Sequence, residues 1–447
     1  MKISLPNDSK LLSPEFTYGV ATASFQIEGG VDERLPCIWD TFCRVKGKIK
    51  DNSNGDIACD HYNRWQQDID LIETLGVDAY RLSISWPRVL KMDGSINQKG
   101  VDFYKRILDR LNDKQIKPFV TLYHWDLPQH HENRGGWLNR ETAFEYADYA
   151  DKISRALGDR VFSYATLNEP YCSAYLGYEA GIHAPGLASK KYGKRAAHHL
   201  LLGHGLAMKA LQANSPNTQN GIVLNFTPCY PSTSASADIQ AAKMADAHFN
   251  QWYIKPLFDA EYPEIIETIP KDERPEIFAG DMEIIAAPLD FMGVNFYTRQ
   301  VYQADTENQF VSLPPSEPVT DIGWEIFPQA FVDLMSDLNQ RYDLPPIYIT
   351  ENGAAMADDY QNGEVIDYDR TRYVQDHLTA LDKIINLGID VKGYFYWSLM
   401  DNFEWAEGYA KRFGIVYVDY ENQKRVLKHS ALAYKDLISN RSTVSSN

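Results

Sequence analysis

The sequence is poor in cysteine and has no long apolar segment. Its five cysteines are an odd number, are spread along the chain and form no CxxC pair, which is typical of reduced thiols in a cytoplasm. The first residues, MKISLPNDSKLLSPEF, have no apolar run after the basic residue near the start, so they do not resemble a secretory signal. No stretch approaches the roughly 20 apolar residues that span a bilayer. We therefore expect a cytoplasmic protein that does not enter a membrane.

Basic residues are outnumbered by acidic ones. The chain has 44 Lys and Arg against 61 Asp and Glu, which gives a formal net charge of −17. An acidic surface repels both the phosphate backbone of nucleic acids and anionic lipid head groups. We therefore expect neither nucleic acid nor a membrane as a partner.

Several catalytic signatures are also missing. The chain has no GxSxG nucleophile elbow of a serine hydrolase, and no HExxH or Cys/His cluster of a zinc site. Two local groups of histidines are present: His130 and His131 with Glu132, and His198 and His199 with His204. We interpret the first group as a solvated loop and the second as ordinary helix packing. We expect no metal and no cofactor.

The chain does contain short apolar runs that alternate with longer amphipathic segments, and its 13% aromatic content indicates a packed rather than a disordered protein. Two segments have helical spacing of apolar residues: RWQQDIDLIETLG, which ends at Gly76, and VDFYKRILDRLNDKQI. The runs that predict strands are Phe16–Ala21, Ala79–Ser85, Pro118–Leu122, Phe162–Leu167, Gly221–Asn225, Phe291–Asn295, Ile347–Thr350 and Gly393–Ser398.

Near-continuous apolar strands that alternate with helices indicate a parallel sheet covered on both faces. Eight such units favour a closed (β/α)8 TIM barrel of the α/β class. A doubly wound open sheet is the alternative, but no GxGxxG follows a predicted strand. We expect one catalytic domain over residues 1–447, with a flexible tail from about residue 440.

Polar and aromatic residues lie at the ends of the predicted strands or just beyond them. In a barrel of this class these ends converge on one face, where active sites are built. Residues far apart in the sequence are therefore expected to share one pocket. They are Gln26, Arg81, His124, Trp125, Asn168, Glu169, Asn295, Tyr297, Glu351 and Trp397.

Two glutamates carry the most specific chemical signal. Glu169 in SYATLNEPY and Glu351 in PIYITENG each directly follow an apolar strand. A carboxyl group at the end of a buried strand is costly unless it is paired or used. Cleavage of an acetal needs two carboxyl groups, one to protonate the leaving oxygen and one to attack the anomeric carbon or to activate water.

The chain resembles glycoside hydrolase family 1, the β-glucosidase family, over essentially its whole length. The motifs that carry the resemblance are FTYGVATASFQIEG, YRLSISWPR, TLYHWDLP, TLNEP, GVNFYT, YITENG and YWSLMDNFEW, in this order. The resemblance implies a retaining β-glycosidase that removes terminal β-D-glucosyl residues from cellobiose, short cello-oligosaccharides and aryl β-glucosides. It also implies cleavage of β-galactosides or β-fucosides and a role in cellulose breakdown.

The resemblance implies a role for each matching residue. Glu351 is the nucleophile and Glu169 the acid/base, while Arg81 and Tyr297 lie beside the nucleophile. Asn168 contacts the sugar 2-hydroxyl, and Trp397 forms the platform under the ring. Trp324, in IGWEIFP, lines the aglycone entrance. The other sugar-binding residues implied are Gln26, His124, Trp125, Asn295, Glu404 and Trp405.

These roles give expectations for the ionisation of the carboxyl groups. Arg81 and a hydrogen bond from Tyr297 favour an ionised nucleophile. The negative charge on Glu351 is expected to raise the pKa of Glu169, because like charges resist a second ionisation. A retaining mechanism requires the two carboxyl groups to lie about 5–5.5 Å apart.

Two alternatives share the fold. Relatives that cleave 6-phospho-β-glycosides replace the late glutamate with a small residue, whereas Glu404 is intact here, and its carboxylate is expected to repel a 6-phosphate. Inactive sugar-binding relatives lose one or both catalytic glutamates, which this chain keeps. Thioglucosidases have Gln in place of the acid/base, which is Glu169 here. One departure is Tyr171 after NEP, where Trp is common, and it concerns aglycone preference.

Overall fold

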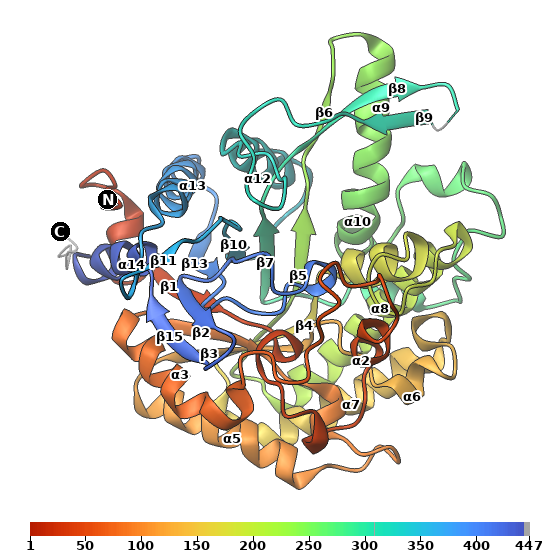
Figure 1. Ribbon diagram of the computed structural model, residues 1–447. Coiled ribbons are helices and arrows are strands. Elements are labelled where there is room, and N and C mark those ends of the chain that lie inside the picture. The colour runs from red at the N-terminus through yellow and green to blue at the C-terminus, as the bar shows by residue number, and fades with distance from the viewer. Residues whose placement is uncertain (308, 442–447) are drawn as a thin grey trace.

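Eight parallel strands close into a barrel in the computed structural model, which describes residues 1–307 and 309–441 (Figure 1). The barrel strands are β1 (Thr17–Ala21), β2 (Ala79–Ser83), β3 (Lys117–Tyr123), β4 (Ser163–Asn168), β5 (Gln219–Phe226), β7 (Phe291–Phe296), β10 (Ile347–Asn352) and β13 (Val391–Trp397). Around the barrel they follow the order β1, β13, β10, β7, β5, β4, β3, β2. Each overlaps the run that predicted it, so the expected (β/α)8 barrel is confirmed.

The strand register brings the candidate residues to one level of the barrel. Ala21 pairs with Trp397 on one side and with Arg81 on the other. Elsewhere in the ring Glu351 pairs with Asn295. Because neighbouring parallel strands end together, side chains from distant parts of the chain meet at the carboxyl ends of the strands.

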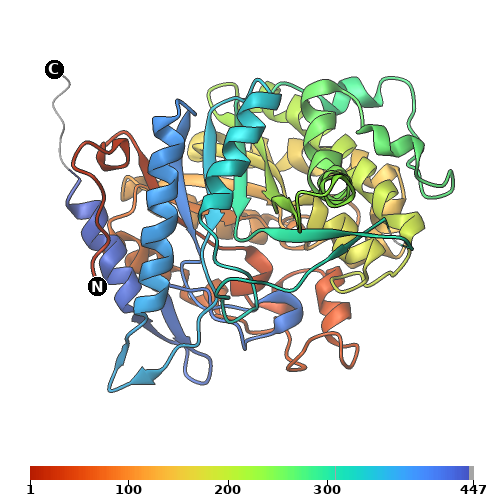
Figure 2. The same cartoon turned by 90° about the horizontal axis from the view of Figure 1, so that it is seen from above.

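Long helices cover the outside of the barrel (Figure 1). They are α3 (His61–Leu75), α5 (Gln98–Asp113), α7 (Glu141–Leu157), α8 (Lys190–Asn214), α12 (Gln329–Arg341), α13 (Tyr368–Asn386) and α14 (His429–Ser439). Both predicted helical segments are confirmed as parts of α3 and α5. Gly76 ends α3 with φ of 71°, a left-handed conformation that glycine adopts without steric cost. Figure 2 shows α12, α13 and α14 next to one another along one side.

Shorter elements occupy the connections between strands and helices. The α-helices in these connections are α1 (Ser24–Ile27), α2 (Ile38–Cys43), α4 (Trp86–Val89), α6 (Gln129–Glu132), α9 (Ser236–Asp246), α10 (Trp252–Asp259) and α11 (Asp281–Ile285). Three small sheets that the sequence did not predict join β6 (Cys229–Pro231), β8 (Gln300–Asp305) and β9 (Gln309–Ser312); β11 (Tyr360–Gln361) and β12 (Glu364–Val365); and β14 (Val416–Asp419) and β15 (Lys424–Leu427).

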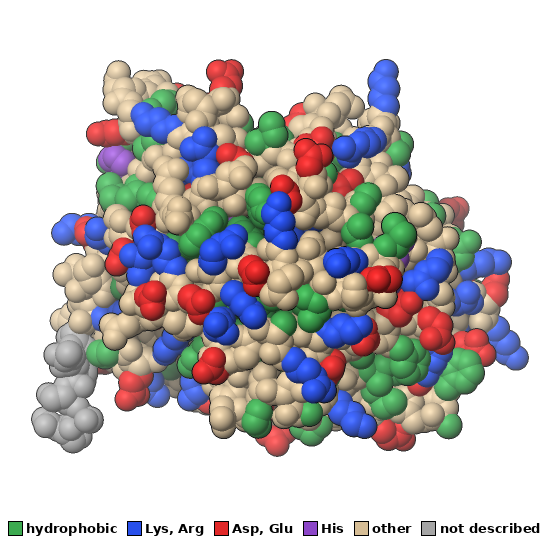
Figure 3. All heavy atoms as spheres, turned by 90° about the horizontal axis from the view of Figure 1, so that it is seen from below, with side chains coloured by type: hydrophobic (Ala, Val, Ile, Leu, Met, Phe, Trp, Pro, Cys, Tyr) green, Lys and Arg blue, Asp and Glu red, His purple; other side chains and the backbone are tan. Residues whose placement is uncertain are grey.

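The surface mixes charges of both signs. On the face drawn in Figure 3, Lys and Arg side chains are interspersed with Asp and Glu. Charges of the two signs are therefore not separated into patches on this face. Within the described residues, no helix is both long and apolar enough to cross a membrane.

The expected tail begins just after α14. Arg441 donates to both carboxylate oxygens of Asp78 at 2.8 Å and to the carbonyl oxygen of Phe16 at 2.8 Å. These bonds attach the start of the expected tail to the barrel. Residues 442–447 of that tail lie outside the described residues.

Candidate active site

The two candidate catalytic glutamates are buried at the carboxyl ends of their strands. Glu351 lies within β10, and Glu169 directly follows β4. Glu169 has φ of 47°, and the neighbouring site residues Trp125 and Trp405 have φ of 77° and 50°. Left-handed conformations cost a non-glycine residue on the order of 1–3 kcal/mol and gather at functional sites. The fold therefore holds these side chains in one orientation at a cost to local stability.

Both oxygens of Glu351 are held by neighbouring side chains. Arg81 Nη1 donates to Oε1 at 2.6 Å, and the Tyr297 hydroxyl donates to Oε2 at 2.6 Å. Arg81 is itself buried, so its charge is poorly screened. The two contacts place a positive charge and a phenol against the carboxyl group and fix its orientation. The structure therefore places Arg81 and Tyr297 beside Glu351.

Glu169 has neutral neighbours instead. Asn295 Nδ2 donates to Oε1 at 2.7 Å, and Cys172 Sγ lies 3.1 Å from Oε2. Burial, and to a lesser extent the charge of Glu351, raise the pKa of Glu169 to about 8. The expected effect of the Glu351 charge is present, and removal from water contributes more than this like charge. At neutral pH Glu169 is therefore mostly a neutral acid.

Asn168 links the two glutamates to the sugar-binding residues. Its Oδ1 accepts hydrogen bonds from Arg81 Nη2 at 2.6 Å and from Asn295 Nδ2 at 3.1 Å. Its Nδ2 lies 3.1 Å from His124 Nε2, and its carbonyl oxygen accepts from Trp125 Nε1 at 2.9 Å. Because Nε2 of His124 accepts this bond, its Nδ1 carries the hydrogen and is free to donate.

Among the described residues, several buried polar atoms around the pocket have no partner. They are Oε1 of Gln26, Nδ1 of His124 and Oε2 of Glu404. A buried polar group without a hydrogen bond is costly, so such a cluster is expected where a polar ligand binds. Acceptors and donors close together match the hydroxyl groups of a sugar.

The pKa of the Glu404 carboxyl group is raised. Burial raises its pKa to about 8, and the charges of Glu351, Glu407 and Glu169 add to this effect. The expectation of an ionised Glu404 that repels a 6-phosphate therefore needs correction. Near neutral pH the side chain is mostly a neutral carboxylic acid, because its burial and the neighbouring carboxyl groups disfavour a further negative charge.

A cavity of about 540 Å³ contains the predicted site. Predicted residues that line it are His124, Trp125, Glu169, Asn295, Tyr297, Trp324, Glu351, Trp397, Glu404 and Trp405. The ring of His124 stacks on Trp397 and Trp405, with centroids 5.7 and 5.9 Å apart. Trp324 lies 5.1 Å from the ring of Tyr297. Gln26, Arg81 and Asn168 are also buried, and each contacts a residue that lines the cavity.

Sequence reasoning missed part of the cavity wall. The other lining residues include Lys50, Cys172, Leu176, Ile182, His183, Asn225, Thr227, Ile322, Glu407 and Phe413. Most lie in loops, where the sequence has no periodicity to show which side chains face inward. Cys172 is the exception, because its position three residues after Glu169 would place it beside that glutamate in a helical turn.

The histidine groups noted in the sequence lie elsewhere. His131 Nδ1 is 2.7 Å from Glu145, and His198 bridges Tyr262 and Asp281 at 2.9 Å each. Each of these two histidines therefore has hydrogen-bond partners within the protein. In the part of the chain that the structure describes, no three His, Cys, Asp or Glu residues form a group that could hold a metal ion.

Comparisons with known proteins find relatives over nearly the whole chain. The profile of Glycosyl hydrolase family 1 matches residues 8–443. The chain is 44% identical to a β-glucosidase of Agrobacterium sp., with 95% of each chain covered. It is 43% identical to a bifunctional β-D-glucosidase/β-D-fucosidase of Bifidobacterium breve, with 96% of this chain and 98% of the relative covered.

A solved structure shows the same fold. The family 1 glycoside hydrolase of Thermotoga maritima, complexed with a cyclophellitol analogue that mimics the transition state, superposes with a TM-score of 0.93. The two chains are 42% identical, and 98% of each is covered. In that relative the fold binds a glycoside-like ligand.

Proposed function

Because the chain belongs to glycosyl hydrolase family 1, and is a retaining β-glucosidase as the similarity to its relatives indicates, we propose that Glu351 and Glu169 are its two catalytic carboxyl groups. The observation that carries this assignment is the contrast between their partners. Glu351 is bound by a cation and a phenol, whereas Glu169 is bound by an amide and a thiol. The first set provides a counter-charge beside the proposed nucleophile, whereas the second provides none beside the proposed proton donor.

In the first step the carboxylate of Glu351 attacks the anomeric carbon and forms a glycosyl ester. The bond from that carbon to the leaving oxygen breaks, and this oxygen takes the proton of Glu169. Arg81 and Tyr297 each bind one oxygen of the Glu351 carboxylate and hold it in position. Removal of solvent around the buried pair strengthens these contacts.

In the second step Glu169, now a carboxylate, takes a proton from water. The water oxygen attacks the anomeric carbon and the ester bond to Glu351 breaks, so that both glutamates return to their starting states. Glycosylation neutralises Glu351 and removes the like charge that opposes ionisation of Glu169. The pKa of Glu169 therefore falls when it has to act as a base.

We propose that the glycone binds among the unpartnered atoms of Gln26, His124 and Glu404, over the ring of Trp397. The amide of Gln26 can donate and accept, and the acid form of Glu404 can do the same. An equatorial or an axial 4-hydroxyl would then find a partner. Together with the bifunctional relative, this supports cleavage of β-glucosides, β-galactosides and β-fucosides. Asn168 would contact the 2-hydroxyl, with Trp125, Asn295 and Trp405 beside the ring.

The aglycone is expected at the mouth of the cavity, where Trp324 and Tyr171 lie. Aromatic faces on this wall fit a second sugar ring or an aryl group. We therefore propose cellobiose, short cello-oligosaccharides and aryl β-glucosides as substrates. We also propose that the chain forms a single catalytic domain and that it acts in cellulose breakdown in the cytoplasm.

Azide rescue of two variants tests the assignment. In Glu351→Gly, azide can occupy the space of the nucleophile and attack an activated aryl glucoside directly, which gives the α-glycosyl azide. In Glu169→Ala the ester still forms with a good leaving group, and azide intercepts it to give the β-azide. Swapped anomers would show that the two roles are reversed. The same α-azide from both variants would exclude a covalent role for Glu351.

A further inference from the structure

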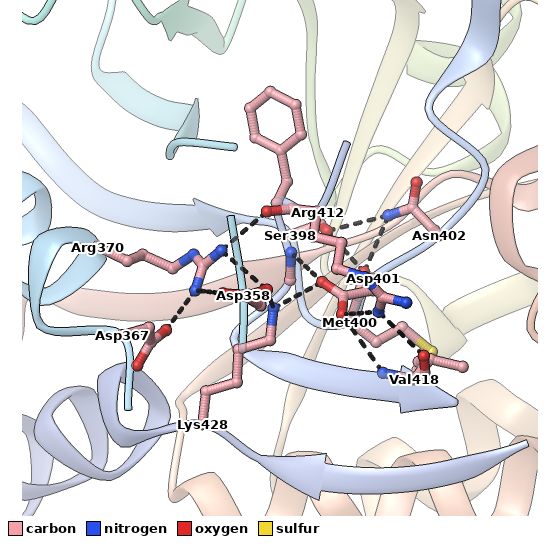
Figure 4. A network of polar contacts seen from close by, with 12 residues as sticks. Asp358, Asp367, Arg370, Ser398, Met400, Asp401, Asn402, Arg412, Val418 and Lys428 are labelled. Atoms are coloured by element: carbon pink, nitrogen blue, oxygen red, sulfur yellow. Dashed lines mark hydrogen bonds and ion pairs between the residues drawn. The ribbon is translucent and has the colours of Figure 1, made fainter. Parts of the chain in front are cut away.

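A chain of buried ion pairs lies behind the loop that carries Glu404 (Figure 4). At its centre is Lys428, which is completely buried. In the sequence it stands between the end of β15 and the start of α14. Its Nζ lies 2.7 Å from Oδ1 of Asp401 and also contacts Oδ2 of Asp358. Lys428 does not line the catalytic cavity. The ammonium group therefore has its contacts with two aspartates rather than with a ligand.

Asp401 ties Lys428 to the loop after β13. Its Oδ2 accepts from Arg412 Nη1 at 2.6 Å, and its oxygens also accept from the backbone nitrogens of Gly414 at 3.1 Å and Val418 at 3.4 Å. The carboxylate thus joins the start of this loop, its end and strand β14. Asp401 is fully buried, so these bonds are protected from water.

Asp358 ties Lys428 to the loop after β10, the strand of the nucleophile. Its Oδ1 and Oδ2 accept from Arg370 at 2.8 and 3.2 Å, and Arg370 also binds Asp367 and the carbonyl oxygen of Arg412, the latter at 2.8 Å. Lys428 therefore bridges the two catalytic loops, beside the bond from Arg370 to the carbonyl oxygen of Arg412 and the backbone bond from Met356 to the same oxygen. The formal charges cancel, because Asp358, Asp367 and Asp401 face Arg370, Arg412 and Lys428.

The next residues along the chain connect this network to the sugar-binding atoms. Asn402, which follows Asp401, accepts from Gln26 Nε2 at 2.9 Å and donates to Ser398 Oγ at 3.0 Å and to the carbonyl oxygen of Met400 at 2.9 Å. Gln26 Nε2 also donates to the carbonyl oxygen of Phe403 at 2.9 Å. With its amide held this way, Gln26 interacts with the side chain of Glu404, and its Oε1 has no partner among the described residues.

Stability alone does not explain a buried ionic network. The cost of removing such charges from water offsets much of their attraction, and well-packed apolar residues often serve the fold as well or better. A fully paired network does hold backbone segments in one arrangement. Here the network holds the segment 398–405, whose last two residues are Glu404 and Trp405.

We propose that Lys428 is a positioning residue for glycone selection. By bridging Asp358 and Asp401 it holds loop 398–405 so that Gln26 and Glu404 meet the 4- and 6-hydroxyl groups of a glucoside, without touching the sugar. This inference rests on the proposed function of the same pocket. It assigns selectivity to a residue outside that pocket.

The test compares kcat/KM on an aryl β-glucoside with kcat/KM on the matching aryl β-xyloside, which lacks the hydroxymethyl group. In Lys428→Met the glucoside-to-xyloside ratio is expected to fall by about 10-fold or more, because a displacement of about 1 Å in a positioned group can cost that much. Arg140→Met is the matched control, since it removes a cation from the buried Asp281 on the outer helices and should leave the ratio unchanged. An equal loss on both substrates would overturn the proposal.

A charge-balanced variant covers the case in which Lys428→Met alone does not fold. Lys428→Met with Asp358→Asn removes one charge of each sign and leaves the pairs Arg370–Asp367 and Arg412–Asp401. The same fall in the ratio is expected, and an unchanged ratio in the folded double variant would overturn the proposal.

A double-mutant cycle tests whether Lys428 affects the substrate ratio through Glu404. In a Glu404→Ser background, Lys428→Met is expected to have no further effect on the ratio, since the contact that it positions is gone. An additive effect would show that Lys428 does not act through Glu404. A wild-type enzyme without activity on β-glucosides would instead contradict the proposed function itself.

Discussion

The thiol of Cys172 lies 3.1 Å from Oε2 of Glu169 and donates its hydrogen to that carboxyl group. The contact follows from a tight turn, because the backbone nitrogen of Cys172 also donates to the carbonyl oxygen of Glu169 at 2.9 Å. A hydrogen bond to the ionised form lowers the pKa of a carboxyl group. The thiol therefore opposes the effect of burial, which holds the pKa of Glu169 at about 8.

Cys172→Ala is expected to raise the pKa of Glu169 and to shift the alkaline limb of kcat/KM to higher pH. A thiol is a weak donor, so we expect a shift of about half a pH unit. Activity falls with rising pH as the acid form of Glu169 is lost, and a higher pKa delays this loss. The measurement is the pH profile on an aryl glucoside with a poor leaving group. Cys172→Ser keeps a donor and serves as the control; an equal shift in both variants would contradict the role of the hydrogen bond.

The wild-type profile of kcat/KM is expected to be bell-shaped, with its alkaline limb near pH 8, where Glu169 loses its proton. Both limbs belong to the coupled pair of Glu169 and Glu351 rather than to single residues. Because two carboxyl groups suffice for the reaction, EDTA should leave activity unchanged. Loss of activity in EDTA that a divalent ion restores would contradict this mechanism.

The raised pKa of Glu169 also predicts a loss of stability with pH. The folded protein binds this proton more tightly than the unfolded chain, in which the pKa is near the usual 4.5. Its contribution to stability is therefore complete below about pH 4.5 and is lost as the pH rises through about 8. We expect the Tm of the wild type to fall as the pH rises over this range, and the Tm of Glu169→Gln to fall less. Calorimetry from pH 5 to 8 checks this, with the exposed Glu15→Gln as the control. Parallel curves for wild type and Glu169→Gln would contradict it.

The barrel could be predicted because its strands are short apolar runs buried on both faces, separated by helical patterns. Glu169 and Glu351 were recognisable because each directly follows such a run. The roles of Gln26 and Glu404 came from the family resemblance, since spacing in the sequence does not show which loop residues share a pocket.

Other features depend on contacts that a sequence does not contain. The bridge from Asp358 to Lys428 joins residues 70 positions apart, and only the packing of β15 against the catalytic loops brings them together. Likewise, burial rather than the count of nearby charges sets the ionisation of Glu169 and Glu404, and burial follows from the folded structure.

Glu404 offers the sharpest test of substrate choice. Its Oε2 is buried without a partner among the described residues, and its pKa is about 8, so near pH 6 it is expected to share hydrogen bonds with the 4- and 6-hydroxyl groups as a neutral acid. Above its pKa the carboxylate would add negative charge beside Glu351 and Glu169, and would then repel a 6-phosphate in a pocket where screening is weak. Selection against phosphorylated substrates should therefore strengthen as the pH rises.

We expect Glu404→Ser to lower kcat/KM on an aryl β-glucoside by roughly 10²-fold, the scale expected when a buried hydrogen-bonding partner is lost. Glu404→Gln keeps a donor and an acceptor, so at pH 6 it should lose less than the serine variant. At pH 8.5, where Glu404 of the wild type is ionised, both variants should have a smaller difference between kcat/KM on the glucoside and kcat/KM on the 6-phosphorylated glucoside. The measurement is kcat/KM on both substrates at the two pH values for all three proteins. A wild type that prefers the phosphorylated glucoside, or a serine variant with unchanged glucoside cleavage, would show that Glu404 does not select the glycone.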